Sequence, residues 1–289
     1  MIVESYNVPA MTTVRVAHSP DSDDAFMFYG LASGAVKAEG ISFVEELSDI
    51  ETLNQAAAQG RYEITAISVH AYAHIADKYR LLDSGASFGD DYGPTVVVPK
   101  GSLIRSVDEL SGKRIAVPGK WTSAALALAL RLPVFTPVIM DFKAVGEAAK
   151  RGEVDAGLVI HEGQLTAEEE GLQVVEDLGK WWKARTGLPL PLGLNAIRRD
   201  LPIQLREQLA RTMAESIDYS LDHREAALDH AMQFARGLDR QRADTFVGMY
   251  VNHWTRKLGA TGREAVALFL HEAAERGLVP RVKPEWQER

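Results

Sequence analysis

The sequence contains no cysteine, and this absence excludes several kinds of site. Disulfide bridges, thiolate zinc sites and a cysteine nucleophile all require that residue. Long apolar runs are also missing, since the longest, residues 124–130, is far shorter than the about 20 residues that span a bilayer. Runs of Lys and Arg with interleaved aromatic residues are absent as well. Nucleic acid and membrane surfaces are therefore not expected partners.

The first 13 residues lack the basic flank, the apolar stretch and the cysteine that secretory or lipid-attachment signals need. A cytoplasmic location is therefore the default expectation. The rest of the composition is ordinary for a globular protein: 46% of the 289 residues are hydrophobic and 25% are charged, with a formal net charge of −8. This length allows two domains, each with its own hydrophobic core.

Short apolar segments alternate with helical patterns along the chain. Strands are predicted at 14–17, 41–45, 64–68, 114–117, 137–140 and 155–160, and helices at 25–33, 49–60, 124–131 and 142–150. Such alternation is typical of parallel sheets joined by right-handed crossovers. The same order of elements occurs twice, about a hundred residues apart. The sequence therefore predicts an α/β fold with two similar lobes and a cleft between them.

We expect residues 14–97 and 196–289 to form the first lobe and residues 98–195 the second. Residues 201–278 are helical in pattern, with apolar side chains every four residues from Leu205 to Leu221. These C-terminal helices are expected to pack on the first lobe.

The ends of several elements also have sequence signals. Capping boxes, in which two side chains satisfy each other's backbone donors, are predicted at 48–51, 106–109 and 261–264. Extended segments with Pro or Gly at Thr95–Pro99 and Pro189–Asn195 flank the second lobe and are candidate hinges.

The segment Val154–Gly163 contains the first candidate site residue. Its apolar run predicts a buried strand of a parallel sheet, and His161 stands where that strand ends. Ligands of open α/β sheets bind beyond the carboxyl ends of strands. Because an ordinary imidazole titrates at about pH 6.5, His161 is a candidate general base, with a half-buried, backbone-bonded histidine as the alternative. Ser68 closes the equivalent earlier strand, and Glu162 is expected to face solvent.

Two helix starts are candidate binding sites. Thr122, Ser123 and Ala124 open a helix after a Pro-Gly turn, where unpaired amides and hydroxyls suit a carboxylate. Helix capping alone is the alternative interpretation. Asp21, Ser22, Asp23 and Asp24 open the first-lobe helix in the equivalent place, and the acidic residues either cap it or accept hydrogen bonds from ligand hydroxyls.

Other residues give weaker signals. His70 and His74 are four residues apart but lack the Glu-x-x arrangement of zinc enzymes, and no Gly-rich nucleotide loop is present. Lys120 is expected near the mouth of the cleft, and Trp181 and Trp182 are expected to cover the junction of the lobes.

Five motifs together resemble a known family. They are S-P-x-x-D-D-x-F-x-F-Y from Ser19, D-I-E-T-L-N from Asp49, V-P-G-x-x-T from Val117, A-G-L-V-I-H-E from Ala156 and W-W-x-x-x-T-G-L-P-L-P-L-G from Trp181. The similarity to the 1,4-dihydroxy-6-naphthoate synthases of the futalosine route to menaquinone runs from about residue 14 to residue 275. The last two motifs are the more specific, whereas the first is shared with the chorismate dehydratases of the same route.

The resemblance implies a two-lobed fold like the type 2 periplasmic-binding proteins, used as an enzyme. It implies a carbon–carbon lyase that converts cyclic dehypoxanthinylfutalosine, a small carboxylate, to 1,4-dihydroxy-6-naphthoate without a metal or an organic cofactor. The histidine base of the family falls on His161, its ligand-binding serine on Ser68, and its Thr-Thr helix start on Thr122 and Ser123.

Two positions depart from the family pattern. Ala66 stands where a lysine is usual, and the usual Pro-Cys-Pro-Asn-Asp turn reads Pro20-Asp21-Ser22-Asp23-Asp24. Recognition of the substrate carboxylate then falls to Lys120 or to helix amides. A chorismate dehydratase and a non-catalytic solute-binding protein are the alternative functions, and the sequence leaves the oligomeric state open, a homodimer included.

Overall fold

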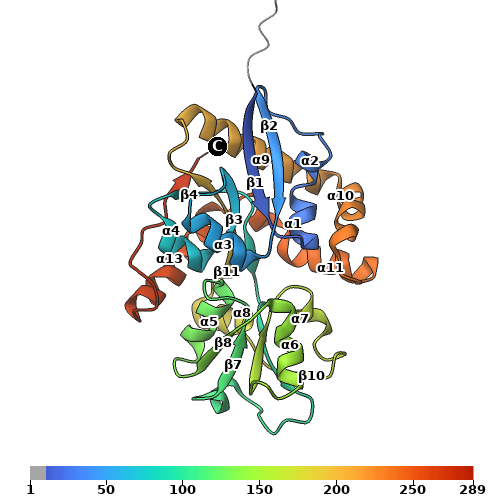
Figure 1. Ribbon diagram of the computed structural model, residues 1–289, viewed down its shortest axis with the longest axis vertical. Coiled ribbons are helices and arrows are strands. Elements are labelled where there is room, and N and C mark those ends of the chain that lie inside the picture. Colours follow the sequence, from blue (N-terminus) through green and yellow to red (C-terminus); the bar gives the residue numbers. More distant parts are fainter. Residues whose placement is uncertain (1–10, 289) are drawn as a thin grey trace, which may run out of the picture.

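The computed structural model describes residues 11–288, which form two sheets stacked one above the other in Figure 1. The strands of the larger sheet are β1 (Thr12–His18), β2 (Ile41–Leu47), β3 (Ile64–Ser68), β4 (Tyr79–Leu82), β5 (Ser87–Gly89), β11 (Leu190–Arg198) and β12 (Trp286–Gln287). Those of the smaller sheet are β6 (Thr95–Pro99), β7 (Arg114–Val117), β8 (Thr136–Ile139), β9 (Ala156–Val159) and β10 (Leu172–Asp177). The predicted α/β fold with two sheets is confirmed.

Helices cover both sheets. In the first part of the chain they are α1 (Ser22–Met27), α2 (Tyr29–Ala32), α3 (Ile50–Ala58), α4 (Val69–Ile75), α5 (Ser123–Arg131), α6 (Phe142–Lys150), α7 (Gly163–Thr166) and α8 (Leu178–Thr186), with the 3-10 helix η1 (Val107–Leu110). The C-terminal part adds α9 (Ile203–Asp222), α10 (Arg224–Ala231), the 3-10 helix η2 (Met232–Phe234), α11 (Arg240–Tyr250), α12 (His253–Arg256) and α13 (Gly259–Glu275).

The two sheets repeat one arrangement. In the larger sheet β2, β1 and β3 are parallel neighbours, followed by antiparallel β11. In the smaller sheet β8, β7 and β9 are parallel neighbours, followed by antiparallel β6. The prediction of one unit used twice is therefore confirmed. Ser68 ends β3, and His161 follows β9 at the equivalent edge.

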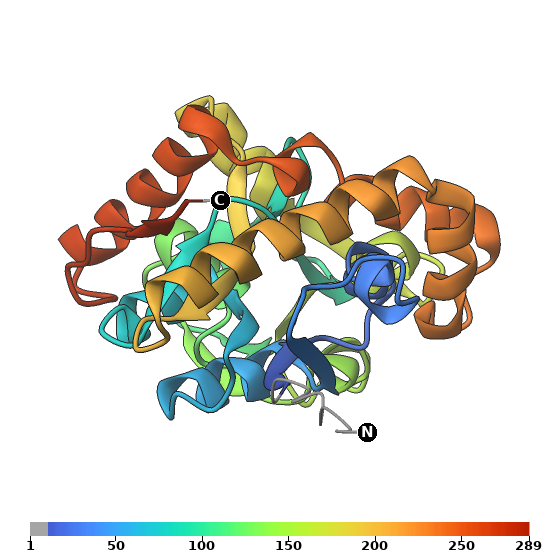
Figure 2. The ribbon, with the colours of Figure 1, turned by 90° about the horizontal axis from the view of Figure 1, so that it is seen from above.

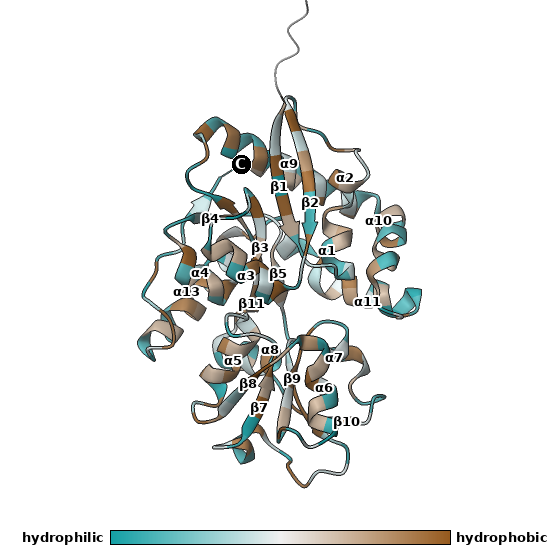
Figure 3. Cartoon of the chain, in the orientation of Figure 1, coloured by the Kyte–Doolittle hydropathy of each residue, from teal (hydrophilic) through white to brown (hydrophobic). Residues whose placement is uncertain are grey.

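The C-terminal helices pack on the larger sheet. Helix α9 crosses that lobe in the view from above (Figure 2), and its stripe of Leu209, Met213 and Ile217 is buried with Val14 and Val16 of β1. In Figure 3 brown and teal segments alternate along α9 and α13, as expected of amphipathic surface helices. No helix among residues 11–288 is long and apolar enough to cross a membrane.

The structure corrects several local predictions. The helix expected over 25–33 is broken at Phe28 into α1 and α2. Asp49, not Ser48, caps α3, since its side chain accepts from the Thr52 amide. The third capping box is wrong because α13 already begins at Gly259, whereas the box at 106–109 is confirmed.

The two extended segments that flank the second lobe are strands. Thr95–Pro99 is β6 of the smaller sheet, and 189–195 falls mostly within β11 of the larger one. The chain therefore passes between the sheets at residues 90–94 and 187–189. The buried Trp182 of α8 packs edge-on against Phe269 of α13 with ring centroids 5.3 Å apart, so it joins the two parts of the molecule as expected.

Candidate active site

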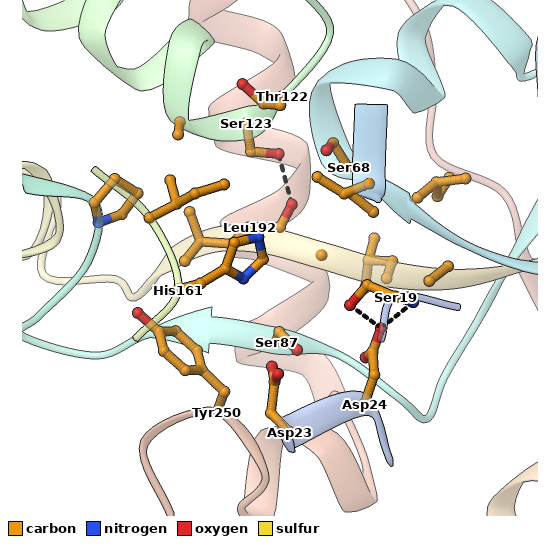
Figure 4. A pocket seen from close by; sticks show the side chains of 18 of the residues that line it. Ser19, Asp23, Asp24, Ser68, Ser87, Thr122, Ser123, His161, Leu192 and Tyr250 are labelled. Carbon is orange, nitrogen blue, oxygen red and sulfur yellow. Dashed lines mark hydrogen bonds between the residues drawn. The ribbon is translucent and has the colours of Figure 1, made fainter. Parts of the chain in front are cut away.

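One pocket between the two sheets is lined by seven of the site residues that the sequence predicts. Its empty space is about 740 Å³, part of it open to solvent, which is in the size range of small-molecule sites. The predicted residues that line it are His161, Ser68, Thr122, Ser123, Ala124, Asp23 and Asp24. Figure 4 shows the His161 imidazole between the Ser68, Thr122 and Ser123 side of the pocket and the Asp23, Asp24 and Tyr250 side. The fold therefore brings together residues more than a hundred positions apart.

His161 has an uncommon backbone conformation. Its φ of +55° lies in the left-handed region, which in a non-glycine residue costs on the order of 1 kcal/mol. The ring lies edge-on to Phe142, with centroids 4.9 Å apart, and its Nδ1 lies 3.1 Å from the carboxylate of Asp21. Burial lowers the pKa of His161, although Glu162, Asp24 and Asp49 act in the opposite direction. This shift favours the neutral imidazole, which is the form that can accept a proton.

Asp23 is a buried carboxyl group in the first turn of α1. Within residues 11–288 its Oδ1 has no hydrogen-bond partner, and the residue is 8% exposed. Burial and the neighbouring Asp24 and Glu162 carboxylates hold the pKa of Asp23 well above its usual range. Asp24 differs, because its Oδ2 accepts a hydrogen bond from the Ser19 amide at 2.8 Å. Two adjacent carboxyl groups thus have different environments, and Asp23 has a buried oxygen that no group within residues 11–288 satisfies.

The start of α5 is partly used within the protein. Thr122 caps the helix, since its hydroxyl accepts from the Ala125 amide at 3.2 Å, as the alternative interpretation expected. The Ser123 hydroxyl donates to the Leu192 carbonyl at 2.6 Å (Figure 4). The amides of Ser123 and Ala124 belong to the first helical turn, which has no intrahelical acceptors. These amides, with the positive end of the helix dipole, are the groups left to bind an anion.

Ser68 faces the pocket from the end of β3 and is held by Asn54. The Asn54 amide donates to the Ser68 hydroxyl at 3.1 Å, and the Asn54 carbonyl oxygen accepts from the Ser68 backbone amide at 2.8 Å. The Ser68 hydroxyl hydrogen is therefore free to be donated to a ligand.

One carboxylate links the two lobes beside the pocket. Glu51 of α3 accepts from the Trp121 amide at 2.9 Å, just before α5. Gly119 lets it approach, since a Cβ there would lie 2.6 Å from a Glu51 carboxylate oxygen, and φ of Gly119 is +155°. Thus Glu51 joins the lobes instead of closing a capping box.

Glu162 and its neighbours overturn one prediction. The sequence places Glu162 in solvent, but the residue is only 6% exposed and its Oε2 pairs with Arg236 at 3.0 Å. Arg236 also pairs with Asp21, which lies 215 residues away in the sequence. No local pattern marks Arg236, and the three acidic residues in the turn at 21–24 are the only sequence signal for this cluster.

Neither Lys nor Arg is among the described residues that line the pocket. These residues therefore supply no permanent positive charge. Ala66 lines the pocket at the place of the usual lysine, and Lys120 is exposed outside it. Of the two expected sources of carboxylate recognition, the helix amides are the one that lies at the pocket.

Several polar lining residues have no sequence motif of their own. They are Ser87, Gln164, Asn195 and Tyr250. The Tyr250 hydroxyl lies 2.8 Å from the side-chain amide of Gln164, and burial raises its pKa far above the usual value. Among residues 11–288 no group of three or more His, Asp or Glu side chains is placed to hold a metal ion.

Comparison with known proteins gives a family and two named relatives. A family model described as menaquinone biosynthesis matches residues 14–275. A Thermus thermophilus protein named 1,4-dihydroxy-6-naphthoate synthase is 40% identical over 268 residues, 93% of this chain and 96% of that protein. A Streptomyces coelicolor protein of the same name is 34% identical over 280 residues, 94% of this chain and 97% of that protein. Both names agree with the resemblance carried by the sequence motifs.

Solved structures show the same architecture. A crystal structure of an Archaeoglobus fulgidus protein has a TM-score of 0.86 and 48% identity, covering 92% of this chain and 98% of that one. The alkanesulfonate-binding protein of Xanthomonas axonopodis pv. citri has a TM-score of 0.70 at 19% identity, covering 96% of each chain. A Candida albicans protein with the generic periplasmic binding protein fold has a TM-score of 0.67 at 14% identity. The last two show the fold alone, and they confirm the predicted periplasmic-binding-protein-like fold.

Proposed function

This chain belongs to the menaquinone-biosynthesis family, and we propose that it is a 1,4-dihydroxy-6-naphthoate synthase acting as a carbon–carbon lyase. Two relatives with that name, aligned over nearly the whole chain, support the proposal. The observation that carries it is the imidazole of His161 in the same pocket as the amide-rich start of α5.

The proposed reaction begins with a proton transfer. His161 removes a proton from a hydroxyl group of the sugar-derived ring, and the electron pair of the O–H bond forms a carbonyl. The adjacent carbon–carbon bond breaks and its electron pair moves into the bicyclic ring, which becomes aromatic as the naphthoate. The sugar-derived fragment that carries the new carbonyl group is released. The proton remains on the imidazolium until solvent or product takes it. Aromatisation supplies driving force, so one well-placed base is sufficient.

The other predicted residues have binding roles in this proposal. The amides of Ser123 and Ala124 hold the substrate carboxylate, with Thr122 fixing the helix start. The Ser68 hydroxyl donates a further hydrogen bond, and Asp23 and Asp24 face the substrate hydroxyls. The interlobe bond between Glu51 and Trp121 keeps the pocket narrow, which limits water at the reacting atoms.

A non-catalytic solute-binding protein is the second candidate, because the fold is shared with solute-binding proteins. A biosynthetic enzyme of the proposed kind fits a cytoplasmic location, whereas a transport protein does not. Binding of the substrate without turnover would support this second candidate.

The test incubates the purified protein with cyclic dehypoxanthinylfutalosine and follows naphthoate by its absorbance and by chromatography. We expect turnover, and we expect His161→Asn to reduce kcat at least about 100-fold, as loss of a general base does. His271→Asn is the matched control, because His271 lies exposed on α13 outside the pocket. If His161→Asn kept activity within tenfold of the wild type, the assignment of the base would be wrong.

A further inference from the structure

Asp21 occupies an unusual position at the start of α1. It stands at the N-cap position but makes no capping hydrogen bond with its side chain. Instead its Oδ2 lies 3.1 Å from Nδ1 of His161 and 2.7 Å from the hydroxyl of Ser19. Its side chain is only 2% exposed. An aspartate at an N-cap ordinarily stabilises its helix, so the carboxylate of Asp21 is used for something other than the helix.

Arg236 completes this arrangement from a third part of the chain, the turn between η2 and α11. Its guanidinium donates to Oδ1 of Asp21, the carboxylate oxygen that does not face His161. It also pairs with Glu162 Oε2 at 3.0 Å. It also lies over the Phe142 ring, 4.8 Å from its centroid, and the edge of Phe142 meets His161. One cation therefore lies between two buried carboxylates that would otherwise repel each other.

The contact between Asp21 and His161 restricts the imidazole. A carboxylate can only accept hydrogen bonds, so the nitrogen facing it must carry the hydrogen. Nδ1 is then the donor, and the lone pair is on Nε2. The same logic applies in serine proteases, where a buried aspartate selects the histidine tautomer and a change to asparagine reduces kcat about 10⁴-fold. Here the two partners come from different sheets, so they meet only when the two lobes are together.

We propose that Asp21 is a positioning residue that holds His161 in the Nδ1–H tautomer, with Nε2 available to the pocket, and that Arg236 holds Asp21 in place. The kinetic part of this inference rests on the proposed function, whereas the tautomer does not. A purely structural role for the same contacts would tie the lobes together without determining which nitrogen carries the hydrogen. The test must therefore measure which nitrogen of the His161 imidazole carries the hydrogen.

The first measurement is the nitrogen NMR spectrum of protein labelled with ¹⁵N-histidine at pH 8, with the His161 signals identified by their loss in His161→Asn. We expect His161 to show a protonated Nδ1 and an unprotonated Nε2, and to change toward the Nε2–H form in Asp21→Ala. An Nε2–H tautomer in the wild type would overturn the inference. This measurement needs neither substrate nor activity.

The charged groups around His161 define the pH of that experiment. Asp21 contacts it from the turn before α1, Asp24 lies in α1, Asp49 caps α3, and Glu162 follows it in the chain. Burial lowers the pKa of His161 against the effect of Glu162, Asp24 and Asp49, and pH 8 is already above the ordinary imidazole pKa, so we expect the neutral ring in this experiment. An imidazolium signal at that pH would also overturn the inference, because the tautomer would not be defined.

The second measurement is turnover of the wild type, Asp21→Asn and Arg236→Gln. We expect kcat of Asp21→Asn to fall at least about 30-fold with KM within about threefold, and Arg236→Gln to change in the same direction by less. Asp239→Asn is the matched control, because Asp239 also stands at a helix N-cap near an arginine but lies outside the pocket, so its kcat should stay within twofold. If Asp21→Asn folds, as shown by its Tm, and retains kcat within threefold, the inference is wrong. If the wild type itself shows no turnover, the proposed function fails, and the tautomer measurement alone decides this inference.

Discussion

Replacing Asp23 by asparagine should stabilise the protein at neutral pH. Asp23 is buried, its Oδ1 has no partner among residues 11–288, and its pKa is raised well above the usual range by burial and by Asp24 and Glu162. A raised pKa means that the folded protein binds this proton more tightly than the unfolded chain does. The stabilisation is therefore complete at low pH and is lost as the pH rises from the ordinary aspartate pKa through the raised one.

The size of the expected stabilisation follows from two opposing free-energy contributions. Ionising a buried carboxyl group without a partner costs at least about 1–3 kcal/mol, a cost that the neutral amide of asparagine avoids, whereas a negative charge in the first turn of α1 gains only about 0.3–1 kcal/mol from the helix dipole. The unfavourable term is larger, so Asp23→Asn should gain about 1–2 kcal/mol at pH 7.5. The gain should be much smaller near pH 4, where the carboxyl group is protonated in the folded protein and about half protonated in the unfolded chain.

The assay is urea denaturation of the wild type and the variant at pH 7.5 and near pH 4. Asp24→Asn is the matched control one residue away, because Asp24 accepts from the Ser19 amide and its replacement should lower the free energy of unfolding by about 0.5–1.5 kcal/mol. The reasoning would be refuted if Asp23→Asn lowered stability at pH 7.5, or if its gain were the same at both pH values.

Three further predictions concern the pocket. The kcat/KM of the wild type should be flat near pH 7 and fall on acidification with a midpoint below pH 6.5, because burial lowers the pKa of the base His161. A midpoint above pH 7 in a pH–rate profile would contradict this. Gly119→Ala should lower Tm and raise KM, since the added Cβ meets Glu51 and breaks its bond to Trp121; unchanged Tm and KM would show that the interlobe bond does not matter. Ala66→Lys should bind simple dicarboxylates more tightly in calorimetry than the wild type does, because it adds a cation to a pocket lined by none; weaker binding would mean that the new ammonium pairs with Asp23 or Asp24 instead.

Sequence reasoning found the elements whose signals are local. The two copies of the strand–helix unit, the end of β9 at His161 and the start of α5 all follow from short apolar runs and turn residues. Because parallel strands end at one edge of their sheet, these local patterns also predicted that the site residues would share one pocket.

Contacts between distant parts of the chain could not be predicted from the sequence. Arg236 lies in a turn with no motif, and only the folded chain places it against Asp21 and Glu162. Glu162 and Asp21 were assigned to solvent and to capping because nothing in the sequence shows that a cation lies between them. Likewise, the hydroxyls of Thr122 and Ser123 are occupied by backbone groups, which a helix-start pattern does not reveal.

Strand β11 lies between β3 and β4 in the larger sheet. In the sequence, however, all the strands of the smaller sheet come between β4 and β11. A ribosome must therefore complete the whole smaller lobe before the centre of the larger sheet can close. At 5–20 residues per second, the about 100 residues between β5 and β11 take roughly 5–20 s to synthesise. During that interval β3 offers a bare hydrogen-bonding edge on the nascent chain, and β4 and β5 have no neighbour there. Chaperone capture of the emerging polypeptide should accordingly be strongest before residue 198 leaves the exit tunnel.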